Sequence, residues 1–207
     1  MYNCAFPSVC DNREYDQARR AYLFALKCDA NNEQTMRELI QLQVHLRDYV
    51  GFEETSRKLL MIKPSVMQHW VQLAMACYVN RNFAGCHAAI ESMLKFDAED
   101  SQKKSMKPYE VSEIVLLGIR CYMRQGKHQE ALTFLKKNQD KIVDTIAKSD
   151  AYGQVHHALG NEAEAVRFFE SLLQLNSANI DTYKKIIMAK GVELPSSDLR
   201  VRLSEAY

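Results

Sequence analysis

Apolar residues recur every three or four positions along most of the chain, and no stretch sustains the strict apolar-polar alternation of a half-buried strand. Four prolines and seven glycines in 207 residues leave long segments without a residue that breaks helices. The pattern therefore predicts a chain that is nearly all α-helical.

The helical segments repeat at a fixed interval. Ala30, Pro64 and Ala98 each close a helix-like segment, in K-C-D-A, M-I-K-P and K-F-D-A, and the three positions are equally spaced. Their interval, about 34 residues with room for two helices, is typical of the tetratricopeptide repeat. Because such a pair buries its apolar face only against its neighbours, we expect an all-α, tetratricopeptide-like α-α superhelix, a solenoid of about ten or eleven helices.

Two glycines mark further repeats downstream. Gly126 and Gly160 are separated by the same interval, and an alanine follows each of them at the fifth position. The step from Cys86 to Ala131 is longer by about 11 residues, and we place this extra length in the polar segment 99–109. We therefore interpret the chain as a single tetratricopeptide-like array, truncated at both ends. Its parts are the first repeats at 11–98, an inserted loop at 99–109 and further repeats at 110–207.

The opening helix lacks a recognisable partner before it. It keeps the spacing of a second helix, whereas the residues preceding it make a poor first helix. We expect this to leave Tyr15, Tyr22 and Leu26 without their usual cover. Either the segment Met1 to Cys10 folds back over them, or a second copy of the chain covers them.

Composition and charge argue against several classes of protein. The 27 lysines and arginines balance 26 acidic residues, so the overall charge does not indicate a particular kind of partner. The chain also has no specific nucleic-acid motif. Three lysine pairs, at 103–104, 136–137 and 184–185, fit solvated helix faces or contacts to RNA phosphates. The longest apolar run, 114–119, is far shorter than the roughly 18 residues of a membrane span. Six cysteines without a CxxC pair fit a reducing compartment, so we expect a cytoplasmic protein without a membrane partner.

No catalytic, cofactor or metal site is predicted. Gly126 and Lys127 lack the spacing of a phosphate-binding loop, and His128 stands where that loop needs Ser or Thr. The adjacent His156 and His157 would point about 100° apart on a helix, so they cannot share a metal ion. An enzyme in its own right would need a clustered polar site, which the sequence does not provide.

The stretch from Arg47 to Trp70, R-D-Y-V-G-F-E-E-T-S-R-K-L-L-M-I-K-P-S-V-M-Q-H-W, resembles the auxiliary subunit of the N-terminal acetyltransferase A complex. Its distinctive part is R-D-x-x-G-[FY]-x-E-T joined to L-L-x-x-[KR]-P. Further likeness lies in Y-D-Q-A-R-R-A-Y-L-F-A-L-K-C-D, in Q-G-K-H-Q-E-A-L with the following helix to Asp144, and in the tail from Tyr183. Together these segments cover residues 13–207.

The resemblance implies a piece from the N-terminal half of a much longer, non-catalytic scaffold. Such a subunit binds and positions an acetyl-CoA-dependent catalytic subunit near the ribosomal exit tunnel, and the family's inositol phosphate site should lie beyond Tyr207. The alternative is a generic tetratricopeptide interaction module, such as a co-chaperone-like adaptor. A clamp for a C-terminal carboxylate needs Lys and Arg four residues apart early in a first helix, and Gln34 and Glu38 stand there instead.

First-helix positions that packing does not use should line a groove on the concave side. These groove candidates are Arg37, Gln41, Val71, Met75, Leu116, Arg120 and Gln154. Apolar groups on such a surface suggest a patch that a partner covers, although packing between repeats explains Val71, Met75 and Leu116 equally well.

Overall fold

The structure, a computed structural model, describes the backbone of residues 11–99 and 106–191. Regular structure in these ranges consists of ten α-helices and one short 3-10 helix, with no strand. The expectation of an all-α chain is confirmed for this part. The chain divides into two compact units, Met1–Ser105 and Met106–Tyr207, whose boundary lies inside the polar segment 99–109.

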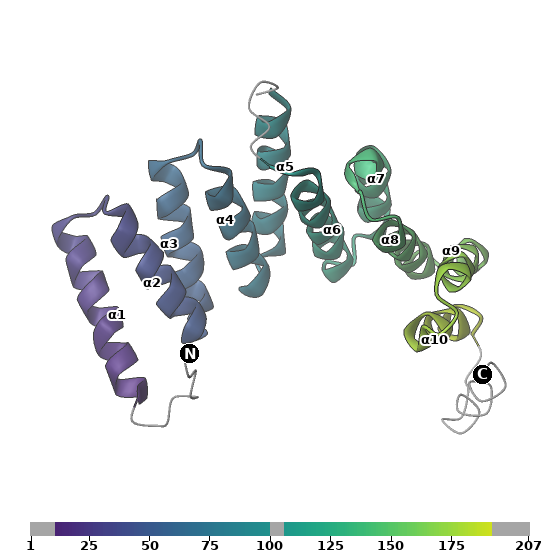
Figure 1. Cartoon of the computed structure of the whole chain (residues 1–207), viewed down its shortest axis with the longest axis horizontal. Helices are drawn as coiled ribbons and strands as arrows, with labels where there is room; N and C mark the ends of the chain where they lie inside the picture. Colours follow the sequence, from purple (N-terminus) through teal and green to yellow (C-terminus); the bar gives the residue numbers. More distant parts are fainter. Residues whose placement is uncertain (1–10, 100–105, 192–207) are drawn as a thin grey trace. The chain divides into compact units, whose positions relative to one another are not determined.

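Unit 1 is a row of five helices, each packed against the next in sequence order (Figure 1). They are α1 (Asp11–Cys28), α2 (Glu33–His45), α3 (Tyr49–Ile62), α4 (Met67–Val79) and α5 (Phe83–Glu99). In the repeat pattern α2 and α4 are first helices, while α3 and α5 are second helices. A core cluster joins α2, α3 and α4 through Met36, Ile40, Phe52, Leu59 and Ala76.

Unit 2 repeats the same arrangement. It contains α6 (Pro108–Arg124), α7 (His128–Asn138), the 3-10 helix η1 (Gln139–Lys141), α8 (Thr145–Ala158), α9 (Glu162–Leu175) and α10 (Ile180–Ala189). Here the first helices are α6, α8 and α10, and α6 contacts both α7 and α8. The core at its end consists of Ala165, Phe169, Leu172, Ile186 and Ala189.

The turn after every first helix contains a residue with positive φ. These residues are Arg47, Arg81, Gly126, Gly160 and Gly191, with φ between 57° and 77°. The step from Arg47 to Arg81 equals the step from Gly126 to Gly160, and the step between these pairs is longer. The spacing found in the sequence therefore recurs in the backbone. Glycine adopts this conformation without strain, whereas the two arginines need the surrounding turn to hold them there.

The R-D-x-x-G motif has a structural reason, and it occurs in a second form one repeat later. The side chain of Asp48 caps α3 by accepting a hydrogen bond from the Gly51 amide at 3.1 Å, and Asn82 caps α5 by accepting one from the Gly85 amide at 3.0 Å. A Cβ atom at either glycine would lie 2.6 Å from the capping side chain. Glycine at this position therefore lets the cap form.

The face of α1 that we expected to be uncovered is covered by α2. The Tyr15 ring lies against His45 with ring centroids 4.8 Å apart, and Leu26 packs against the core cluster of α2 to α4. Tyr22 hydrogen-bonds with Glu38 of α2, an interaction that raises the pKa of the phenol above its usual value. These tyrosines and Leu26 are half-buried, so α2 covers them in part, and none of the described side chains at 14–28 is fully buried.

The apolar groups that α1 leaves exposed lie elsewhere on the helix. Phe24 is 66% exposed and Leu23 is 44% exposed. Tyr15, Tyr22 and Leu26 lie on the face of α1 that is turned toward α2. Leu23 and Phe24, which are next to Tyr22 in the sequence, therefore face outward. The segment Met1 to Cys10, expected to cover this helix, lies outside the described residues.

Candidate protein-docking surface

Four of the seven groove candidates lie on the first helices of unit 1. Arg37 and Gln41 are exposed on α2. On α4, Met75 is 54% exposed and Val71 is half-buried. Because Val71 and Met75 are four residues apart, they share one face of α4.

Two further apolar side chains extend these exposed rows. Val79 follows Met75 after one more helical turn and is 42% exposed, and Val44 follows Gln41 on α2 and is 46% exposed. Neither residue is among the groove candidates, although the same i, i+4 spacing indicates Val79. We call the row formed by Val71, Met75 and Val79 the α4 row.

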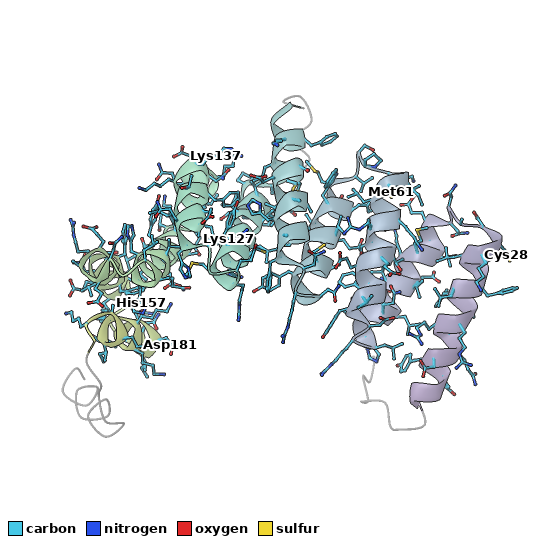
Figure 2. The ribbon with its side chains drawn as sticks, turned by 180° about the vertical axis from the view of Figure 1, so that it is seen from behind. Cys28, Met61, Lys127, Lys137, His157 and Asp181 are labelled. Carbon is cyan, nitrogen blue, oxygen red and sulfur yellow. The ribbon has the colours of Figure 1, made fainter. Side chains whose placement is uncertain are left out.

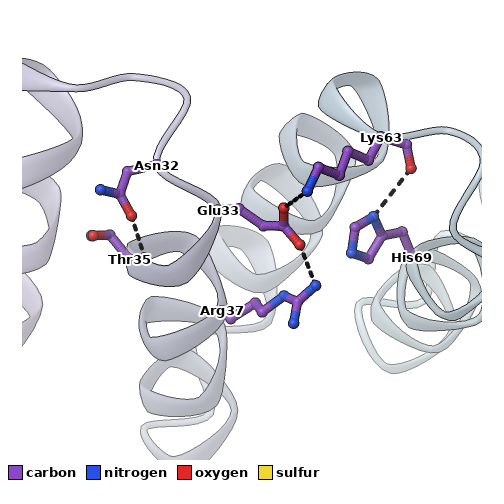
Figure 3. Close-up of polar contacts among 6 residues, drawn as sticks. All are labelled: Asn32, Glu33, Thr35, Arg37, Lys63 and His69. Atoms are coloured by element: carbon purple, nitrogen blue, oxygen red, sulfur yellow. Dashed lines mark hydrogen bonds and ion pairs between the residues drawn. The ribbon is translucent and has the colours of Figure 1, made fainter.

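A cluster of charged groups holds the beginning of α2 close to the beginning of α4 (Figure 3). The Glu33 carboxylate accepts hydrogen bonds from Arg37 on its own helix and from Lys63 in the loop before α4. The bond from Lys63 is the main reason why the pKa of Glu33 lies below its usual value. The carbonyl of Lys63 lies 3.2 Å from Nδ1 of His69, a buried residue of α4. Arg37 is therefore paired, but it shares the single Glu33 carboxylate with Lys63, so this cluster keeps a net positive charge.

A buried carboxylate anchors the other end of α4. Glu53 of α3 is 9% exposed, and its two oxygens accept hydrogen bonds from Asn80 and Asn82, each at 2.8 Å, in the turn after α4. Arg57 donates a third bond at 2.9 Å. Burial acts to raise the pKa of Glu53, but the bonds from Asn80, Asn82 and Arg57 outweigh it, so the pKa lies below its usual value. The α4 row is thus fixed at both ends.

The three groove candidates in unit 2 differ in solvent exposure. Arg120 on α6 and Gln154 on α8 are exposed, but Leu116 on α6 is only 5% exposed. The expectation that Leu116 lines an open groove is wrong. Helix α6 packs against both α7 and α8, so it buries an apolar band wider than one helical face.

Gln154 borders a hollow of about 230 Å³ within unit 2. Helix α8 contributes Gln154, His157 and Ala158, and α10 contributes Lys185 and Met188. Figure 2 labels His157 on α8 and marks α10 at Asp181. The hollow is lined by groups that are distant in the sequence, and no sequence motif predicted it.

The remainder of the hollow is apolar. Met123 of α6 and Phe169 of α9 complete its lining, and Phe169 is 1% exposed. Gly153 of α8 allows this packing, since a Cβ atom there would lie 2.4 Å from Cε1 of Phe169. We refer to this feature as the α8–α10 hollow.

Other kinds of site were sought in the same residues. Within 11–99 and 106–191, no three His, Cys, Asp or Glu side chains gather in a way that could hold a metal ion. In that same part, none of the helices combines the length and apolar character that crossing a membrane requires. The exposed rows and the α8–α10 hollow are candidate binding features of the described residues.

Comparison with known proteins gives these surfaces a context. A family model described as "N-terminal acetyltransferase A, auxiliary subunit" matches residues 109–207. The chain is 29% identical over 198 residues to "N-alpha-acetyltransferase 16, NatA auxiliary subunit" of Mus musculus, a match that covers 94% of this chain and 22% of that protein. The chain thus spans about a fifth of the length of this relative.

Solved structures agree with the sequence comparison. The structure of Naa15/Naa10 bound to HypK-THB matches with a TM-score of 0.74 and 25% identity, over 94% of this chain and 29% of that one. YrrB, a TPR protein with an unusual peptide-binding site, matches with a TM-score of 0.57 over 84% of each chain. Its identity is 11%, so it shows the fold alone. These matches confirm the tetratricopeptide-like solenoid as the fold class.

Proposed function

We propose that this chain, a relative of the auxiliary subunits of N-terminal acetyltransferase A, is a non-catalytic scaffold that binds and positions the catalytic subunit of an N-terminal protein acetyltransferase. The observation that carries the proposal is the similarity, over 94% of the chain, to a protein named as an auxiliary subunit. In the same proposal residues 1–207 form one array of repeats, with extra length between α5, which ends at Glu99, and α6, which begins at Pro108. The protein works in the cytoplasm, at the ribosome.

The proposed docking residues are the groove candidates on first helices that are exposed or half-buried. They are Arg37, Gln41, Val71 and Met75 in unit 1, and Arg120 and Gln154 in unit 2. The α4 row is its apolar part, and an exposed methionine at its centre suits a partner surface of irregular shape, because the side chain is flexible and polarisable. The Arg37 guanidinium is paired with Glu33, and covering a paired charge costs less desolvation free energy than covering a lone charge.

The hydrogen bond between Gln34 and Glu38 is evidence against the carboxylate clamp of a co-chaperone. Such a clamp needs two cations at the positions of Gln34 and Glu38, and here Gln34 Nε2 donates to Glu38 Oε1 at 2.8 Å. An acid at this place repels a terminal carboxylate. The scaffold proposal is therefore better supported than the adaptor alternative.

The proposal is tested by mixing the purified chain with the catalytic subunit of an N-terminal acetyltransferase A complex. Sedimentation velocity should show a complex of one copy of each. Assayed alone with acetyl-CoA and a peptide substrate, the chain should transfer no acetyl group. Separate sedimentation of the two proteins at micromolar concentration, or acetyl transfer by the chain alone, would overturn the proposal.

A further inference from the structure

We propose that the α8–α10 hollow binds one aromatic side chain, Phe or Tyr, presented by an uncharged segment of a partner protein. The volume of the hollow, about 230 Å³, sets the size of the occupant. An apolar cavity of roughly 150 Å³ already accommodates benzene. Pockets for small-molecule ligands usually span about 300 to 1,000 Å³. The hollow therefore matches a single large side chain better than a cofactor.

The lining favours an aromatic ring. Met123 and Met188 contribute two thioether side chains, and Phe169 contributes a ring at the buried end. Sulfur atoms make favourable contacts with aromatic rings, and aromatic pairs gain energy beyond the area they bury. Met188 is 66% exposed at present, so an occupant would cover an apolar group that now faces solvent.

The lysines and acids around the hollow are already paired, which argues for an uncharged occupant, while the buried Nδ1 of His157 has no hydrogen-bond partner. Lys185 donates to Asp150, and the other oxygen of that carboxylate accepts a bond from Gln154 at 2.6 Å. The other two lysines at α10 also have acidic partners, in the pairs Lys184–Asp181 and Lys190–Glu170. A carboxylate from a partner would have to displace one of these acids. A neutral side chain enters without disturbing them.

The test uses the full 207-residue chain with ¹³C-labelled methionine methyl groups, assigned by single substitutions. The probes are N-acetyl-phenylalanine amide, N-acetyl-leucine amide and N-acetyl-aspartate amide. We expect the methyl signals of Met123 and Met188 to shift saturably with the phenylalanine probe. The dissociation constant should be on the order of millimolar, as suits a ligand of this size. The leucine probe should bind several-fold more weakly, and the aspartate probe should cause no saturable shift.

The chain provides its own controls. Met61 and Met75 are 77% and 54% exposed and lie in unit 1, so their methyl signals should not respond. The variant Ala158→Leu, which fills the hollow, should weaken the phenylalanine probe at least tenfold while the far-ultraviolet circular dichroism spectrum stays helical. Shifts at Met123 and Met188 no larger than those at Met61 and Met75 would overturn the proposal, as would equal binding of the aspartate probe.

A competing occupant lies in the chain itself. Residues 192–207 follow α10 and contain one aromatic residue, Tyr207. Nuclear Overhauser contacts between the Met188 methyl group and the Tyr207 ring, in the absence of probe, would overturn the partner proposal in favour of this tail. Because the test omits the catalytic subunit, its failure would leave the scaffold function untouched, and failure of the scaffold function would leave this result standing.

Discussion

Asn82 donates a hydrogen bond from Nδ2 to Oε1 of Glu53 at 2.8 Å, across 29 residues of sequence. The other end of the same amide, Oδ1, accepts from the backbone of Gly85 at 3.0 Å and so caps α5. One side chain therefore begins a helix and fastens it to the preceding helix pair. A capping side chain that also bonds to the preceding pair of helices is one way in which unit 1 fixes the register of its repeats.

Replacing Glu53 with Gln should destabilise unit 1 by about 1 to 3 kcal/mol. The amide nitrogen of the new side chain would face one of the amide donors of Asn80 and Asn82, which would leave a buried donor without an acceptor. Urea unfolding followed by circular dichroism measures the change. Glu54→Gln, an exposed position on the same helix, should stay within about 0.5 kcal/mol of the parent, and an equal effect of both variants would refute this role of Glu53.

The contribution of Glu53 should depend on pH. Its pKa is lower in the folded protein than in the unfolded chain, where a glutamate titrates near about 4.3, so between the two values the unfolded state binds more protons. The stabilisation is then fully present above about pH 4.3 and is lost as the pH falls through the lower, folded value. The difference in unfolding free energy between the parent and Glu53→Gln should be constant from pH 6 to 7 and shrink below about pH 4. A difference that stayed the same down to pH 3 would contradict the assignment.

Replacing Gly153 with Ala should destabilise unit 2, although alanine favours helices. The new methyl group would lie 2.4 Å from Cε1 of Phe169, a rigid ring that is 1% exposed, so the ring or the helix has to shift. Overpacking of this kind costs about 1 to 3 kcal/mol, which exceeds the gain of about 1 kcal/mol from helix propensity. Thermal unfolding should show a lower melting temperature than for Ser149→Ala, a substitution on the same helix that adds no atoms. A rise in melting temperature would show that the α8–α9 packing is looser than described.

The sequence predicted the parts of the fold that depend on local spacing. The equal steps and the longer step between them reappear at the positive-φ turns, because a turn is set by its own few residues. Burial was harder to predict where one helix has two neighbours. Leu116 is buried because α6 contacts both α7 and α8, and Tyr15 and Tyr22 are covered because α1 turns these positions toward α2.

The candidate surface was predictable only in part. The exposure of Met75 follows from its spacing on α4, which a periodic pattern can give. The α8–α10 hollow brings together Met123 and Met188, which lie far apart in the sequence. Its volume depends on how four helices pack, and Gly153 has its role only because Phe169 lies against it. Neither the volume of the hollow nor the contact between Gly153 and Phe169 follows from a repeating pattern in the sequence.

The most direct test of the scaffold account compares two methionines of unit 1. Met75 lies on a first helix, in the α4 row, and is 54% exposed, while Met61 lies on a second helix and is 77% exposed. Because both side chains face solvent, Met75→Glu and Met61→Glu should each change the unfolding free energy by less than about 0.5 kcal/mol. Titration calorimetry with the catalytic subunit should then show an affinity loss of at least about tenfold, or about 1.4 kcal/mol, for Met75→Glu and none for Met61→Glu. Unchanged affinity of Met75→Glu, or an equal loss in both variants, would contradict the account.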